Sequence, residues 1–167
     1  MTTTVQIAAG DPNLLDAVRR ARKMLNRRAL VGAAAGAVPI PGLDWLVDAA
    51  LLSKLLPAIN AEFGLTPEQL DRLPKKKREQ VQQAISVVGS MVIGKFITRD
   101  LVIRMAASIG KRITARQAAK YVPIAGQALS AVIGYTAIRY LGEQHIRDCV
   151  EVCKAAHLKL PAPSAQA

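Results

Sequence analysis

Apolar residues recur at intervals of three and four along much of the chain, which is the spacing of one face of an α-helix. The clearest series follows Asp11-Pro12 and contains Leu14, Val18 and Leu25. Asp11 is expected to cap this helix and Pro12 to occupy its first position, where an N–H group is not needed. No window of convincing length alternates with a period of two. The pattern therefore predicts an all-α fold.

Proline and glycine divide this pattern into segments. The sequence Val-Pro-Ile-Pro-Gly at residues 38–42 must end the first helix, because two prolines and a glycine leave too few backbone donors. A similar sequence, Val-Pro-Ile-Ala-Gly, stands at residues 122–126. These breaks predict two apolar helical hairpins within a compact bundle of about six helices. The later helices are expected at residues 43–62, 66–73 and 74–97, then as one or two helices broken near Gly110 at residues 97–121, and finally at residues 123–157 with a weak point at Gly142.

Local signals mark two of these helix boundaries. Gly64 follows the second helix and is typical of a left-handed C-cap. Thr66 and Gln69 have the spacing of a capping box, and Leu65 and Leu70 that of a hydrophobic staple. We expect one helical domain at residues 11–158, with flexible ends at residues 1–10 and in the proline-rich stretch 159–167.

Small residues recur four apart in three of the predicted helices. Residues at this spacing share one helix face, and their lack of bulk lets another backbone come close. We therefore predict tight helix packing at these positions: Gly32, Gly36, Ser86, Ser90, Gly94, Gly126, Ser130 and Gly134.

The chain is strongly basic, with 23 lysines and arginines against 12 acidic residues and a net charge of +11. Such a charge favours polyanionic partners without identifying one. The basic clusters flank the apolar segments, which suits an anionic membrane surface. The candidate contacts are Arg19, Arg20, Lys23, Arg27, Arg28, Lys75, Lys76, Lys77, Arg78, Arg104, Lys111, Arg112, Arg116 and Lys120. A soluble nucleic-acid-binding protein is the alternative, which the scarcity of aromatic residues and of known recognition motifs disfavours.

Two motifs suggest chemistry, and neither is complete. Residues 89–96 resemble a phosphate-binding loop, but Phe96 stands where that loop needs a hydroxyl group for magnesium, and the apolar residues before it favour a buried helix. His145, Cys149, Cys153 and His157 lie four apart on one helical stripe, which spans about 18 Å and is too long to surround one ion. We expect no catalytic residue, cofactor or metal, and hence no enzyme.

Asp44 and Asp48 are the candidate buried acids. Asp44 falls in the first turn after the Pro-Gly break, where the helix dipole favours a carboxylate. Asp48 shares a face with Leu51 and Leu55, so it needs a cationic partner. An ion pair that stabilises the fold is the favoured interpretation of both, ahead of a functional carboxylate.

The sequence gives limited evidence about compartment. Residues 121–138 form the longest apolar stretch and lie at the lower limit for crossing a membrane. The N-terminus lacks the pattern of a secretory signal, and cysteines one turn apart are poorly placed for a disulfide. We therefore expect a cytoplasmic protein that is peripheral to, or shallowly inserted in, the inner membrane.

The residues Ala33 to Asp44, followed by Val47-Asp48 and Phe63-Gly64-Leu65, resemble the bacterial YcjF-type helical domain. Residues 121–126, with Gly134 and Gly142, resemble the second half of that family. The helical part is also similar to EcsC-type proteins and to the C-terminal region of immunity-related GTPases. The resemblance covers roughly residues 25–152. It implies a membrane-associated accessory module that works with a GTPase on a separate chain, and it supplies no catalytic residues. Self-association of the chain is a further expectation.

Overall fold

The computed structural model describes residues 4–36, 43–90, 93–94 and 125–160, and for residues 32–36, 43–49, 125–134 and 137 it describes the backbone alone. The helices are α1 (Thr4–Ala8), α2 (Pro12–Gly36), α3 (Leu43–Glu62), α4 (Pro67–Asp71), α5 (Lys75–Val88) and α7 (Ala125–Ala155). Within these ranges there is no strand. The predicted all-α fold is confirmed.

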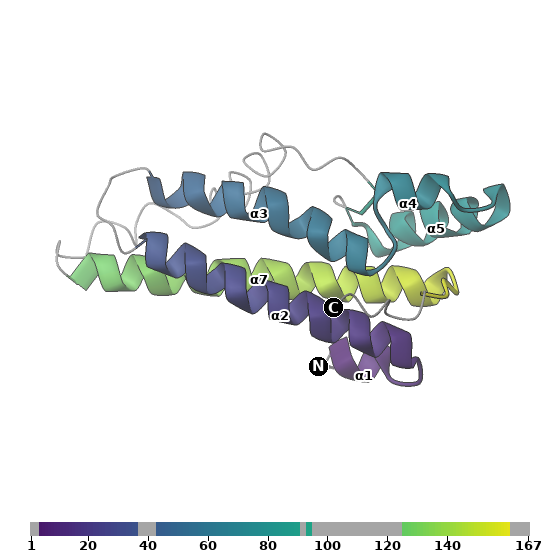
Figure 1. The fold of residues 1–167 in the computed structure, drawn as a ribbon, viewed down its shortest axis with the longest axis horizontal. Helices are drawn as coiled ribbons and strands as arrows, with labels where there is room; N and C mark the ends of the chain where they lie inside the picture. Colours follow the sequence, from purple (N-terminus) through teal and green to yellow (C-terminus); the bar gives the residue numbers. More distant parts are fainter. Residues whose placement is uncertain (1–3, 37–42, 91–92, 95–124, 161–167) are drawn as a thin grey trace, which may run out of the picture.

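Three long helices form the body of the molecule. Helices α2, α3 and α7 pack on one another along their lengths, with α2 running opposite to the other two (Figure 1). Helices α1, α4 and α5 gather at the end where α7 finishes, which we call the capped end (Figure 1). The C-terminal end of α2 and the N-terminal ends of α3 and α7 lie at the other end, which we call the tip (Figure 1).

One apolar core joins these helices. It contains Leu25 of α2, Ile59 of α3, Phe63 directly after α3, Val81 of α5 and Ile146 of α7, all of them fully buried. Burial of side chains of this size is the main source of stability in a bundle of this kind. The largest of them, Phe63, lies beside the C-terminal end of α3 at the capped end.

The predicted caps of the first helices are confirmed. The Leu14 N–H donates to Asp11 Oδ1 at 3.1 Å. Helix α3 ends in a Schellman motif, in which Gly64 has φ +67° and the Leu65 N–H donates to the Asn60 carbonyl at 2.9 Å. The capping box of α4 is complete, because the Gln69 N–H donates to the Thr66 hydroxyl and the Thr66 N–H donates to the Gln69 side chain.

The predicted helix at residues 74–97 is wrong beyond Val88. Helix α5 ends there because Gly89 has φ +74° and its N–H closes the last turn on the Ile85 carbonyl. Ser86, Ser90 and Gly94 therefore do not lie on one helix. Ser86 is exposed and donates to the Gln82 carbonyl at 3.1 Å. Of this predicted ladder, Gly94 makes the closest approach, since a Cβ there would lie 3.0 Å from Leu70 Cδ1.

Gly142 is a packing position and not a weak point. Helix α7 continues through it without a break. A Cβ at Gly142 would lie 2.3 Å from Leu25 Cδ1, so only glycine lets α2 approach α7 this closely. Close packing by a small residue thus occurs on α7, but more than two turns away from the nearest predicted ladder position, Gly134.

Several predicted residues are outside this description. The Pro/Gly break at residues 38–42 lies outside the described residues, and so does the second break as far as Ile124. The same holds for five of the predicted surface cations: Arg104, Lys111, Arg112, Arg116 and Lys120. The structure gives only the backbone of the other predicted small residues, which lie on α2 (Gly32 and Gly36) and on the first turns of α7 (Gly126, Ser130 and Gly134). It likewise gives only the backbone of Asp44 and Asp48, on the first turns of α3 near the tip. The roles predicted for these residues stay predictions.

Candidate functional site

A polar cluster lies buried between α3 and α7. His145 Nε2 lies 2.8 Å from Asn60 Oδ1, and the Cys149 Sγ lies 3.6 Å from the same oxygen. His145 is 5% exposed, and its burial lowers its pKa to about 4, against a smaller opposite effect of a hydrogen bond with the Leu56 backbone. The imidazole is therefore neutral at physiological pH, because burial disfavours its charged form.

The predicted stripe of histidines and cysteines does not form one site, because three of its residues are buried and His157 is exposed. Burial raises the pKa of the Cys149 thiol well above its usual value and that of Cys153 to about 12, so neither is a reactive thiolate. The Cys153 thiol donates to the Phe63 carbonyl at 3.6 Å. His157 is exposed beyond the end of α7, with φ +48°, in a second Schellman motif. The described residues contain no cluster of three side chains that could ligate a metal.

The segment that resembles a phosphate-binding loop has a different structural context. It follows helix α5, whereas a genuine loop of this type follows a strand. Ile93 within it is 1% exposed. This part of the segment, in the residues that the structure describes, contributes to the core.

Several of the predicted surface cations form contacts within the molecule. Arg20 pairs with Glu62 of α3 at 2.6 Å. The Lys77 ammonium donates to the Ala156 carbonyl at 3.0 Å, at the C-terminal end of α7. Arg78 pairs with Asp71 at 3.3 Å. These contacts join elements of the capped end and reduce the charge that is free for an external partner.

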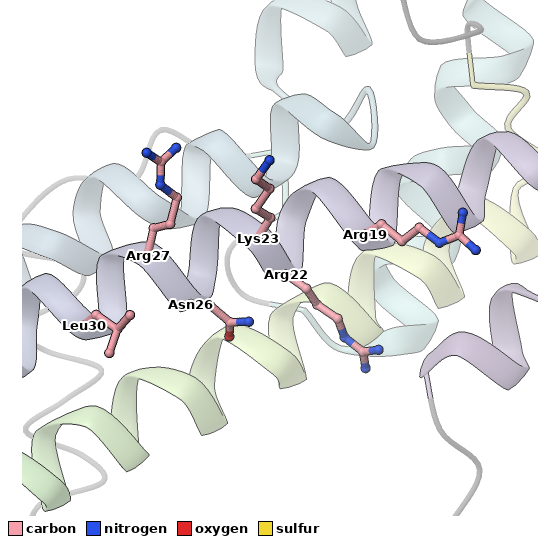
Figure 2. Close-up of a pocket in the computed structure, with 6 residues that line it drawn as sticks. All are labelled: Arg19, Arg22, Lys23, Asn26, Arg27 and Leu30. Carbon is pink, nitrogen blue, oxygen red and sulfur yellow. The ribbon is translucent and has the colours of Figure 1, made fainter.

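Along α2 the basic side chains are arranged differently. Lys23 and Arg27 are exposed, four residues apart, and have no ion-pair partner among the described residues. They extend from α2 in the same direction, whereas Arg22 extends towards α7 (Figure 2). Arg19 adds a third cation at the same spacing; its pair with Asp16 is largely exposed and therefore weak. These three residues, Arg19, Lys23 and Arg27, form what we call the cationic stripe.

The cationic stripe borders a shallow groove of about 710 Å³. The groove is lined by Arg19, Arg22, Lys23, Asn26, Arg27 and Leu30 (Figure 2). Arg22, Asn26 and Leu30 were not among the predicted site residues. Arg22 makes a bidentate pair with Glu143 of α7, at 2.8 and 2.9 Å. The charge of Arg22 is therefore paired with a carboxylate on another helix. The sequence pattern did not indicate this pair, because the two residues come together only when the helices pack.

Exposed apolar residues continue from the cationic stripe towards the tip. Leu30 is 61% exposed and Val31 is 60% exposed. Arg28 is half-buried, and Lys75 and Lys76 are exposed at the start of α5. The combination of exposed cations with an adjoining exposed apolar pair therefore belongs to α2. No helix in the described ranges is both long enough and apolar enough to cross a membrane.

The fold and surface define a basic helical module. Two curated relatives are the interferon-inducible GTPase 5 of Bos taurus, 25% identical, and that of Rattus norvegicus, 24% identical, each over 151 residues. Each match covers 87% of this chain and 32% of the relative, so the chain spans about a third of their length. No protein-family model and no solved structure matches the chain. The chain is thus distantly related to a region of interferon-inducible, or immunity-related, GTPases; the YcjF-type and EcsC-type resemblances stay predictions.

Proposed function

We propose that this protein is a non-catalytic helical module that binds an anionic membrane surface through α2. The observation that carries the proposal is the succession of Lys23 and Arg27, free of ion pairs among the described residues, and the exposed Leu30 and Val31. Basic residues beside an apolar segment bind membranes by combining electrostatic attraction with burial of apolar area. A membrane relieves both the like-charge repulsion along α2 and the exposure of its apolar pair.

The proposed contact is shallow. Gly36, at the end of α2, is six positions beyond Leu30, which corresponds to about 9 Å along the helix axis at 1.5 Å per residue. This part of α2 is far shorter than the hydrocarbon thickness of about 30 Å, so we propose that α2 lies at the membrane surface and buries only one face, as interfacial helices do. Asp44 and Asp48 lie at the same end of the molecule and oppose deeper entry. Our proposal for a bacterial cell is therefore a peripheral or shallowly inserted position at the cytoplasmic face of the inner membrane.

Co-sedimentation with vesicles tests this proposal. The protein is expected to sediment with vesicles that contain phosphatidylglycerol and to stay in the supernatant with pure phosphatidylcholine. The double variant Leu30→Glu/Val31→Glu is expected to lose most of this binding. Val87→Glu is the matched control, because Val87 is 79% exposed but lies on α5. Recovery of the unaltered protein wholly in the supernatant at low salt contradicts the proposal, and salt-sensitive binding to DNA or RNA in the same experiment supports the nucleic-acid alternative.

We further propose that the module acts beside a GTPase domain on another chain, as the YcjF-type resemblance implies. The distant relationship to interferon-inducible GTPases supports this partner. Purification of the native protein from membranes under mild crosslinking is expected to recover a protein with a GTP-binding domain, or a second copy of this chain. Recovery of the protein alone, from crosslinked intact membranes, contradicts this part of the proposal.

A further inference from the structure

We infer that the cationic stripe of α2 recognises a lipid headgroup that carries two phosphate groups close together. This inference rests on the proposed membrane binding and names the lipid class that α2 selects. Its basis is the spacing of the cations. Arg19, Lys23 and Arg27 succeed one another at about 6 Å along the helix axis, which is four residues at 1.5 Å each.

The stripe is unfavourable without an anion. Cations four residues apart on one helix repel each other, by roughly 0.2–0.5 kcal/mol a pair. Asp16 forms one weak, exposed ion pair with the stripe. The carboxylate of Glu62 is paired with Arg20 and that of Glu143 with Arg22, so neither offsets the charge of the stripe. The stripe thus holds at least two positive charges that no described carboxylate offsets. Two adjacent phosphates, each opposite a cation, complement this arrangement better than one isolated phosphate does.

The groove beside the stripe favours a lipid over a free polyphosphate. Asn26 is exposed next to Arg27 and adds an amide donor, while Leu30 supplies an apolar wall at the end towards the tip. Figure 2 shows Leu30 beyond Arg27 along α2, with its side chain on the same side of the helix as that of Asn26. A headgroup in the groove that both rows of side chains line therefore has an apolar surface at one end for the start of an acyl chain. A free polyphosphate leaves this surface exposed.

Vesicles matched in charge provide the test. Phosphatidylcholine vesicles with 10% cardiolipin, which carries two phosphates, are compared with vesicles holding 20% phosphatidylglycerol, which carries one, so that both have about the same surface charge. The unaltered protein is expected to bind the cardiolipin vesicles about tenfold or more tightly. Lys23→Gln/Arg27→Gln is expected to bind both kinds weakly and without preference. Arg72→Gln/Lys159→Gln, which removes two exposed cations of the capped end, is expected to keep the preference.

The outcomes separate this inference from the proposed function. Equal binding to both kinds of vesicle overturns the inference and leaves membrane binding intact. Absence of binding to either kind overturns both. Millimolar pyrophosphate is the competing free polyphosphate; if it displaces the protein from cardiolipin at constant ionic strength, the source of the phosphates is a soluble anion and the lipid assignment is wrong. Loss of the preference in the Arg72→Gln/Lys159→Gln variant also overturns the assignment to α2.

Discussion

At the capped end, basic side chains hold the molecule together, whereas the cations of the cationic stripe on α2 face solvent. Lys77 donates to the carbonyls of Ala156 and His157, directly after α7, and Lys154 donates to the Ile7 carbonyl of α1. Lys23 and Arg27 belong to the same residue types and have no such partner in the described part of the chain. A sequence-level count of cations treats these two groups alike, although only the second leaves its charge available to a partner.

Apolar residues differ between the same two regions. Phe63, near the capped end, is fully buried, whereas Leu30, towards the tip, is 61% exposed. Stability and binding are therefore expected to depend on different residues. Substitutions near the capped end should unfold the protein, and substitutions along α2 should change binding while the fold remains intact.

Phe63→Ala is the largest expected effect in this comparison. Removal of a fully buried phenylalanine leaves a cavity and typically lowers the free energy of unfolding by about 3–5 kcal/mol. Leu30→Ala is the control, with an expected change of about 0.5 kcal/mol or less. Urea denaturation followed by circular dichroism measures both. Equal losses for the two variants would remove the distinction between the regions.

The pH dependence of stability should reveal the buried His145. Its pKa is about 4 in the folded protein and near 6.5 when unfolded, so the unfolded state binds more protons between these values. The contribution of His145 to stability is therefore fully present above pH 6.5, and it falls by about 3 kcal/mol as the pH drops to 4. Denaturation in urea at several pH values measures this slope.

Asp148 opposes this effect in part of the same range. Burial raises its pKa to about 6, helped by the neighbouring charge of Glu151, while Arg147 and Ser90 lower it. The folded protein therefore binds the extra proton here, and this contribution to stability grows as the pH falls from 6 to 3.8. Asp148→Asn removes the opposition, so the fall with acid should steepen in that variant. A flat profile for Asp148→Asn would show that His145 is not buried in the neutral form.

Gly142→Ala tests the close approach of α2 and α7. The new Cβ would lie 2.3 Å from Leu25 Cδ1, and overpacking of this kind costs about 1–3 kcal/mol. Alanine regains up to about 1 kcal/mol of helix propensity, so a net loss of about 1–2 kcal/mol is expected. In a Leu25→Ala background the clash is absent, and Gly142→Ala should stabilise the protein. Additive effects of the two substitutions in a double-mutant cycle would argue against the contact.

Thr66→Ala removes the capping box of α4. The Gln69 N–H then loses its acceptor, which typically costs about 1 kcal/mol. Thr66→Ser keeps the hydroxyl group and should restore nearly all of the stability. Thermal denaturation of the three proteins measures the difference, and an equal loss in the serine variant would mean that the methyl group matters more than the cap.

The sequence allowed prediction of features that depend on neighbouring residues. The Asp11 cap, the Gly64 motif and the Thr66–Gln69 capping box each involve residues within five positions, and all three are confirmed. Prediction failed at Gly89, because the apolar residues after it favoured a longer helix than the left-handed glycine allows.

Features that depend on how the helices pack on one another could not be predicted from the sequence pattern. The partners Leu25 and Gly142, Asn60 and His145, and Arg22 and Glu143 are separated by 85 residues or more. Helical periodicity places each of these residues on a face, but it does not determine which faces meet. Cations that bind within the molecule therefore could not be distinguished from those left exposed.

Lys23→Glu has the smallest expected effect on stability and the most specific one. The substitution converts two repulsive pairs, with Arg19 and Arg27, into attractive ones four residues apart. Each pair changes from a repulsion to an attraction of similar size, so stability should rise by about 0.8 kcal/mol at low salt even at the low end of such pair energies. This gain should disappear at 1 M salt, where exposed charges are screened within about 3 Å. Binding to anionic vesicles should fall in the same variant. A substitution that stabilises the fold while abolishing binding identifies Lys23 as a residue retained for a partner; a loss of stability instead would show that Lys23 supports the bundle, as Lys77 does at the capped end.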